Sequence, residues 1–180
     1  MNDSTHIRKE SEEVLYSLES AVRVGRQDVD FLKKTAEQNW RKRIRLCAHG
    51  STDDSLHEMF IVHTKDTYVR PHKHLGKSEA LHIIEGSVDL VTFDDTGDIT
   101  CITSMGDYDS GLPFYHRLSE PAYHTLLITS DVLVFHEITN GPFKRSDTIW
   151  APWAPEDSDV ESVNRFTERL ARSVDMATAE

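Results

Sequence analysis

Cysteine is scarce in this sequence. Only Cys47 and Cys101 occur in 180 residues, and they lie far apart. Because the chain shows no signal-peptide pattern, we interpret both as reduced thiols and expect a cytoplasmic protein. The fold is therefore not expected to depend on a disulfide framework.

Basic residues and long apolar runs are also in short supply. Lys and Arg number 20 against 31 Asp and Glu, which gives a formal net charge of −11. Nucleic-acid-binding domains normally carry a basic face, so the charge argues against a nucleic-acid partner. No apolar run approaches the ~18 residues of a membrane helix, which argues against a membrane partner and favours a soluble protein. Internal repeats and low-complexity tracts are absent as well.

The length suits one compact domain with helical additions. Apolar residues at helical spacing predict a short helix over 11–22, a second one after Gly25, and a third over 157–174. We therefore divide the chain into an N-terminal helical extension (1–40), a β-domain (41–156) and a C-terminal helix (157–180) that packs on the β-domain. The helices are expected to cover that domain, and a dimer contact through them is a second possibility.

Between the helices the chain is rich in short β-like runs separated by turns. Two of them, 87–93 and 99–105, flank a turn at 94–98 and predict a hairpin. The remaining runs lie at 58–63, 67–70, 79–85, 113–118, 124–128 and 132–138. The pattern predicts a mainly β protein.

The stretch PHKHLGKSEALHIIEG, residues 71–86, carries three side chains able to bind a metal. His72 and His74 are two apart, so on a strand both imidazoles lie on one face. Glu79 shares its face with apolar residues, where a carboxylate is costly unless it is paired or bound to a metal. By the same alternation His82 points away from Glu79. The pattern predicts a metal site; the alternative is that the histidines belong to a loop and the glutamate is solvated.

A fourth candidate ligand stands further along the chain. His124 begins the apolar run 124–128 after a Glu-Pro turn, and strand alternation places it on one face with two aliphatic residues. His116, in the preceding predicted strand, is its competitor, with a role as a polar wall residue as the alternative. We expect His124 to complete the site.

The spacing H-x-H, four residues, Glu, six residues, Gly resembles the first signature motif of the cupin superfamily. The segment around His124 resembles the second motif more loosely, and Asp66 stands where the first motif usually opens with glycine. The resemblance implies a single cupin barrel (double-stranded β-helix, or jelly roll) with flanking α-helices. It also implies a metal inside the barrel, held by His72, His74, Glu79 and His124.

A narrower resemblance is to the WbuC-type cupin-fold metalloproteins of bacterial polysaccharide gene clusters. It is carried by TYVRPHKHLGKSE, EGSVDLVTFDDTGDI, His124, NGPF and APWAPE, which span roughly 43–156. It implies a metal-binding protein that acts near nucleotide-sugar or surface-polysaccharide chemistry, without implying a particular reaction. By analogy with cupins we also expect a homodimer.

Three imidazoles and one carboxylate suit a divalent transition metal. We place Fe²⁺ first, with Mn²⁺, Ni²⁺ and Zn²⁺ as alternatives, since ligand type alone does not choose among them. The leading hypothesis is a metal-dependent enzyme for a small polar metabolite, with dioxygenase, isomerase and lyase chemistry all open. The alternatives are a non-catalytic binding or sensor module and a purely structural metal.

No catalytic residue is assigned from the sequence, and the substrate-binding candidates are polar residues near the motifs. Arg45 belongs to a basic cluster that usually forms a solvated edge; if it turns toward the barrel mouth, it can bind carboxylate or phosphate. His136, with its neighbour Glu137, can support a metal ligand or be a hydrogen-bonded core residue. The full set of candidates is Arg45, Tyr68, Arg70, Arg117 and His136.

Overall fold

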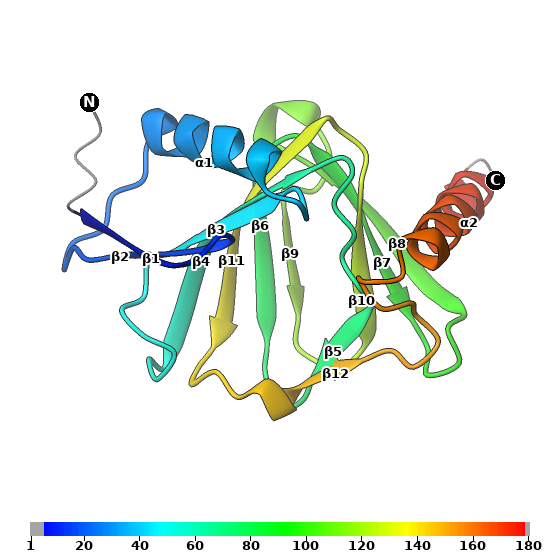
Figure 1. Cartoon of the computed structure of the whole chain (residues 1–180). Coiled ribbons are helices and arrows are strands. Elements are labelled where there is room, and N and C mark those ends of the chain that lie inside the picture. Colours follow the sequence, from blue (N-terminus) through cyan, green and yellow to red (C-terminus); the bar gives the residue numbers. More distant parts are fainter. Residues whose placement is uncertain (1–5, 179–180) are drawn as a thin grey trace.

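Two β-sheets face one another, and one helix lies on the outer side of each (Figure 1). The computed structural model describes residues 6–178. In chain order its helices and strands are β1 Ile7–Ser11, β2 Val14–Ser17, α1 Arg26–Gln38, β3 Arg43–Cys47, β4 Leu56–Thr64, β5 His72–His74, β6 Glu79–Glu85, β7 Ser87–Phe93, β8 Ile99–Gly106, β9 Tyr115–Leu118, β10 Tyr123–Ile128, β11 Val132–Asn140, β12 Thr148–Trp150 and α2 Val160–Thr178, with short 3-10 turns at Tyr108–Ser110 (η2) and Arg145–Asp147 (η3).

The strand order defines the fold. The larger sheet runs β1-β2-β3-β4-β11-β6-β9 and the smaller one β12-β5-β10-β7-β8. Without β1 to β3 and β12, two four-stranded sheets remain, and the chain from β4 to β11 crosses repeatedly between them. This is the order of a jelly roll, the architecture of cupins. The predicted fold class, a mainly β jelly-roll barrel with flanking N- and C-terminal helices, is confirmed.

Three separate apolar clusters hold these layers together. The barrel interior is filled by side chains from both sheets, among them Leu81, Leu126 and Phe135. On the outer face of the larger sheet, Leu32 and Ala36 of α1 are fully buried against β3, β4 and β11. On the outer face of the smaller sheet, α2 packs against β7 and β10. The helices therefore cover the outer faces of the sheets, and the candidate site lies inside the barrel.

The helix predicted over 11–22 is wrong. The structure has strands there, with β1 and β2 antiparallel and β2 parallel to β3. Val14 and Tyr16 face the barrel cluster, whereas Leu15 joins the cluster under α1. The apolar residues 14–16 have an apolar cluster on each face of the sheet, which suits a strand. Burial on both faces outweighs the helical spacing of the sequence. The boundaries at residues 41 and 156 remain predictions, although β1 and β2 belong to the same sheet as the barrel strands.

A second correction concerns residues 67–70, which were predicted as a strand and form irregular chain. The Thr67 hydroxyl donates to the carbonyl of Lys42 at 2.7 Å, and Tyr68 donates to Pro155 at 3.0 Å. These bonds to other segments replace a strand ladder. The predicted second helix and hairpin are confirmed as α1 and β7–β8.

The structure also bears on the expectations for the two cysteines and for membrane-spanning helices. Cys47 is buried, Cys101 is exposed, and both are free thiols. Within residues 6–178, neither helix combines the length and the apolar character needed to cross a membrane.

Candidate metal centre

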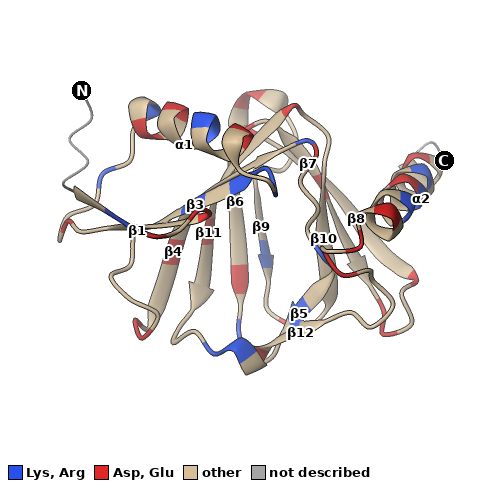
Figure 2. Cartoon of the chain, in the orientation of Figure 1, with Lys and Arg blue, Asp and Glu red and all other residues tan. Residues whose placement is uncertain are grey.

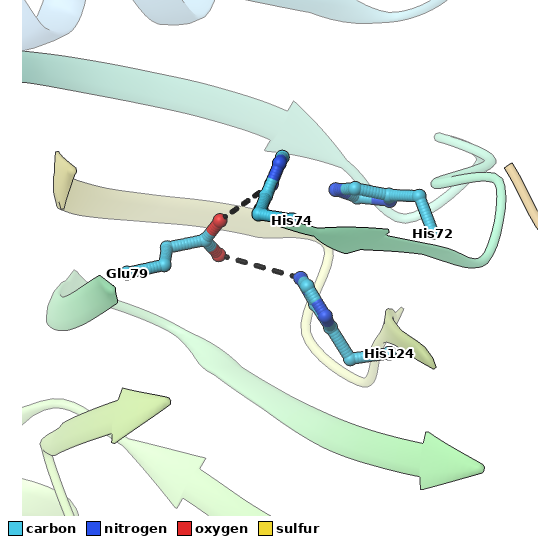
Figure 3. Close-up of side chains that lie close together, drawn as sticks. All are labelled: His72, His74, Glu79 and His124. Carbon is cyan, nitrogen blue, oxygen red and sulfur yellow. Dashed lines mark ion pairs between the residues drawn. The ribbon is translucent and has the colours of Figure 1, made fainter. Parts of the chain in front are cut away.

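Four side chains from two distant parts of the chain converge inside the barrel. They are His72 and His74 of β5, Glu79 at the start of β6, and His124 of β10 (Figure 3). One ligand atom from each lies within 4.8 Å of every other. Glu79 is 8% exposed and His124 3%. The structure thus brings together the four residues that the sequence singles out as candidate ligands.

Strand pairing creates the convergence. In the ladder between β10 and β5, His124 lies directly opposite His72. On the other side of β5, β12 places Thr148 opposite His74 and Trp150 opposite His72. The turn around Gly76, which has φ 66°, then returns the chain so that Glu79 enters β6 facing the same interior. A left-handed backbone conformation at this turn favours glycine.

Main-chain carbonyls orient two of the rings. His72 Nδ1 lies 2.8 Å from the carbonyl oxygen of Arg70, and His124 Nδ1 lies 3.0 Å from that of Ala122. A ring nitrogen at this distance from a carbonyl must donate, so in the neutral imidazole Nε2 is left as the acceptor. Metal-bound histidines commonly use this arrangement.

The carboxylate of Glu79 lies between two of the imidazoles. His74 Nε2 is 2.9 Å from Glu79 Oε2, and His124 Nε2 is 3.5 Å from Glu79 Oε1. Burial would raise the pKa of Glu79, but the nearby imidazoles of His124 and His74 outweigh it and hold the pKa well below the usual value. Burial likewise opposes protonation of His124, and the neighbouring carboxylate outweighs it, so the pKa of His124 is raised.

His72 behaves differently, because it is buried and, unlike His74 and His124, forms no ion pair with Glu79 among the described residues. Burial, with nearby His124 as the next cause, lowers its pKa to about 3. The neutral ring is thus ready to donate its lone pair at any physiological pH. A neutral imidazole is the form that binds metals.

The donor set fits a divalent metal ion. His124 Nε2 is buried and has no hydrogen-bond partner among the described residues, although it points at the cluster. An orphaned buried nitrogen is unfavourable unless something else satisfies it. Three imidazoles and one carboxylate are ligands that Mn, Fe, Ni and Zn accept.

A cavity of about 770 Å³ opens beside the cluster. Its apolar lining comes from the barrel interior and includes Met59, Ile61 and Phe135. Trp150, 48% exposed, also lines it, with its ring centroid 5.3 Å from that of His72. A cavity of this size accommodates a small organic molecule next to the four ligands.

One polar residue inside the cavity stands out beside the cluster. Glu137, on β11, lies opposite Leu81 of β6 and lines the cavity. Burial, and after it the charge of Glu79, raises the pKa of Glu137 to about 8. The sequence singled it out only as a neighbour of His136; its own signal is strand alternation, which places it on the interior side with Phe135.

The structure brings only one of the predicted substrate-binding residues to the cavity. Arg45 lines it. The other four lie elsewhere. Tyr68 packs toward α2, Arg70 lies 3.9 Å from Glu156, Arg117 donates to Ser78, and His136 stacks on Phe60.

His116 is not among the four clustered residues. It lies opposite Leu81 on β9 and is half-buried, and burial followed by the influence of His124 lowers its pKa. Three parts of the cavity wall are not predictable from the sequence: the N-terminal hairpin, the η3 turn, and β12 with Trp150. Their side chains reach the cavity only through long-range pairing, which leaves no local pattern.

Fold and centre together define a jelly-roll protein of the cupin type with a metal-competent His/Glu cluster. A family model described as a domain of unknown function, DUF6016, matches residues 24–105. The match covers less than half of the chain and includes His72, His74 and Glu79 but not His124. No curated protein sequence matches the chain.

Three solved structures illustrate the similarities in shape. Protein SO0799 from Shewanella oneidensis is 12% identical, with a TM-score of 0.46, over 57% of this chain and 66% of its own. A Lactobacillus farciminis oxalate decarboxylase in complex with formate is 13% identical, with a TM-score of 0.43, over 54% of this chain and 27% of its own. The Bacillus subtilis oxalate decarboxylase, which has Mn(II) centres, is 14% identical, with a TM-score of 0.43, over 54% of this chain and 24% of its own.

The chain thus spans less than two thirds of each of these proteins. Similarities at these scores carry no argument about this protein. The fold assignment rests on the strand order, and the centre rests on its own geometry.

Proposed function

We propose that this protein is a metal-dependent cupin enzyme in which His72, His74, Glu79 and His124 hold one divalent metal ion. Its substrate is a small polar metabolite that binds to this metal from the adjoining cavity. The observation that carries the proposal is the convergence of four ligand atoms within 4.8 Å at the wall of a cavity of about 770 Å³.

The chain's own residues have separate tasks in this proposal. His72 and His124 present Nε2 because carbonyls hold their Nδ1 protons, and Glu79 supplies negative charge. The apolar wall excludes water from the reacting atoms, which strengthens electrostatic interactions there. Glu137 can hold or deliver a proton inside the cavity. A bound metal would supply Lewis acidity toward a substrate oxygen.

The finer expectations from the sequence are part of the same proposal. We take Fe²⁺ as the first candidate metal, with Mn²⁺, Ni²⁺ and Zn²⁺ as alternatives. We keep a WbuC-type role close to sugar or nucleotide-sugar chemistry, a cytoplasmic location and a homodimer as proposals. The residue resemblance supports the role and the homodimer, and the signal-peptide argument from the sequence supports the location.

Metal analysis of the purified protein tests the proposal. We expect close to one divalent ion per chain, and loss of most of it in His124→Ala. His82→Ala is the matched control, since His82 lies on β6 but is exposed on the outer face. His116→Ala should also keep its metal; loss of metal there, with retention in His124→Ala, would move the fourth ligand to His116.

Turnover separates an enzyme from a binding module. We expect the metal-containing protein to bind a small polar metabolite, such as a sugar derivative, and to convert it to product. The His124→Ala variant should not convert it. Recovery of the retained compound chemically unchanged would favour the binding or sensor alternative. Absence of stoichiometric metal from protein purified or reconstituted with each of the four candidate ions would refute both.

A further inference from the structure

Ten of the 20 lysines and arginines have an acidic ion-pair partner among the described residues, and the state of those at the cavity is informative. Arg41 and Arg43 line the cavity and both contact Glu13, at 2.6 and 3.0 Å. Two residues further along β3, Arg45 is exposed, lines the same cavity and forms no ion pair in the described part of the chain, although its charge acts on Glu137. A guanidinium that faces a cavity without an ion-pair partner is available to bind an anionic ligand.

The position of Arg45 is set by the sheet. Arg45 lies opposite Ile61, Ile61 opposite Phe135, and Phe135 opposite Ile83, so β3 and β6 are three strand spacings apart. At the usual spacing this places their backbones roughly 14 Å apart. Glu79 of the metal-competent cluster lies four residues from Ile83 along β6, which adds about 13 Å along the strand to this separation. Apolar side chains of β4 and β11 line the cavity between the two ends.

The mouth of the cavity adds positive charge. Lys144 and Arg145, at the η3 turn, also line the cavity and have no ion-pair partner among the described residues. Figure 2 shows this basic turn beside β5 and β12. Exposed cations at a cavity entrance raise the local concentration of anions.

The acids that line the same cavity do not cancel these cations. Glu12 contacts Lys9, Glu13 is occupied by two arginines, and Glu79 lies in the histidine cluster. Glu137 is the remaining one, and even when it is charged the four glutamates that line the cavity are outnumbered by its six lysines and arginines.

We propose that the substrate is an anionic metabolite with two binding groups. One group binds the metal held by the His/Glu cluster, and the other is a carboxylate or phosphate that Arg45 binds, on the far side of the apolar side chains of β4 and β11. This inference rests on the proposed function, since it takes the cluster as a metal site. The planar guanidinium offers two parallel donors to either oxyanion. The strands outside the eight-strand barrel would thus select the substrate, while the barrel strands hold the metal.

Calorimetry on the full chain reconstituted with Zn²⁺ tests the inference without relying on turnover. The probe is 3-(3,4-dihydroxyphenyl)propanoate, whose vicinal hydroxyls bind metals and whose carboxylate lies several atoms away. The shorter analogues (3,4-dihydroxyphenyl)acetate and 3,4-dihydroxybenzoate place the carboxylate closer to the hydroxyls. The corresponding amides have the same shape without the charge, and (3,4-dihydroxybenzyl)phosphonate distinguishes a preference for phosphate-like groups from one for carboxylates.

We expect at least one acid to bind about tenfold or more tightly than its amide, as charge-assisted hydrogen bonds allow. Arg45→Gln should abolish this preference and Arg45→Lys should restore part of it. Arg23→Gln is the matched control, because Arg23 is exposed, lies away from the cavity and involves the same change of charge.

Three results would overturn the inference while leaving the proposed function intact: a zinc-containing protein that binds acids and amides equally, one that binds neither, or an Arg45→Gln variant that keeps the preference. Failure to take up zinc or another divalent ion would instead refute the proposed function, and this inference with it.

Discussion

His72 and His124, 52 positions apart in the chain, lie directly opposite each other in the ladder between β5 and β10, with ring centroids 4.6 Å apart. Each ring also lies close to the carbonyl two residues before it. The backbone of the barrel therefore sets both the spacing and the orientation of these imidazoles. The expectations below follow from this arrangement and from other contacts of the fold.

Metal affinity should depend on pH through His124. The pKa of this imidazole is raised because the nearby Glu79 carboxylate outweighs the effect of burial, and the ring must lose its proton before it binds a metal. Below that pKa, affinity should fall about tenfold per pH unit. Zinc competition against a chelator between pH 5.5 and 9 measures this, and a flat profile would contradict it. In Glu79→Gln the dependence should move to lower pH, in addition to a general loss of affinity.

Acid should destabilise the protein through His63. Burial, with Arg43 as the second cause, lowers the pKa of this residue to about 3. The unfolded chain takes up the same proton near pH 6.5, so unfolding becomes more favourable as the pH falls between these values. At pH 5 the effect is about 2 kcal/mol. Urea unfolding at pH 7 and pH 5 should show a smaller loss for His63→Gln than for the wild type; equal losses would refute this assignment.

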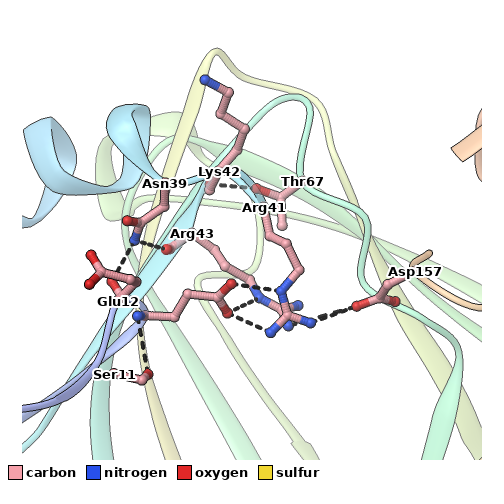
Figure 4. A network of polar contacts seen from close by, with 9 residues as sticks. Ser11, Glu12, Asn39, Arg41, Lys42, Arg43, Thr67 and Asp157 are labelled. Carbon is pink, nitrogen blue, oxygen red and sulfur yellow. Dashed lines mark hydrogen bonds and ion pairs between the residues drawn. The ribbon is translucent and has the colours of Figure 1, made fainter.

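A charged network ties the N-terminal hairpin to the segment before α2 (Figure 4). Arg41 donates to both carboxylate oxygens of Glu13 at 2.6 Å and to Asp157 at 2.7 Å. Its side chain is 32% exposed, so solvent reduces the worth of these bonds. We expect Arg41→Gln to lower the free energy of unfolding by roughly 1–3 kcal/mol.

The control for this network is Arg172→Gln, which breaks the exposed pair with Glu168 at 3.9 Å. Its effect should stay under about 0.5 kcal/mol. A double-mutant cycle between Arg41 and Asp157 isolates their coupling. A coupling near zero would show that the network does not connect the two segments energetically.

Two glycines with left-handed backbone offer a matched pair. At Gly86, φ is 89° and an added Cβ would lie 2.2 Å from the Val132 carbonyl oxygen and 2.4 Å from Ser130 Oγ. At Gly76, φ is 66° and nothing lies within 4 Å. We expect Gly76→Ala to cost about 1–2 kcal/mol of stability and Gly86→Ala about 2–5 kcal/mol. Thermal and urea unfolding compare them, and equal losses would contradict the steric argument.

Local pattern made much of the centre predictable. His72, His74 and Glu79 fall within eight residues, and strand alternation alone assigns them to one side. The prediction of His124 required the second motif and the turn before it. The structure places His124, and not His116, in the cluster. Glu137 shares the same alternation, but nothing in its immediate sequence distinguishes an interior carboxylate from a solvated one.

What escaped prediction depends on segments far apart in the chain. The apolar triplet at 14–16 is compatible with a helix until β3 and α1 are in place on either side of it. Tyr68 and Arg70 sit beside the motif in sequence, yet bonds to the segment before α2 draw them away. Arg45 was selected by its chemistry, and its location depends on pairing with β4.

The N-terminal hairpin forms a wall of a cavity whose candidate metal ligands all come from other strands. In the proposed function, metal coordination and substrate recognition would thus be encoded in separable stretches of the polypeptide. Exchanging the hairpin and its partner strand would retarget the pocket while leaving the reactive end untouched, so these segments are the natural place to engineer, or to look for, a change of specificity.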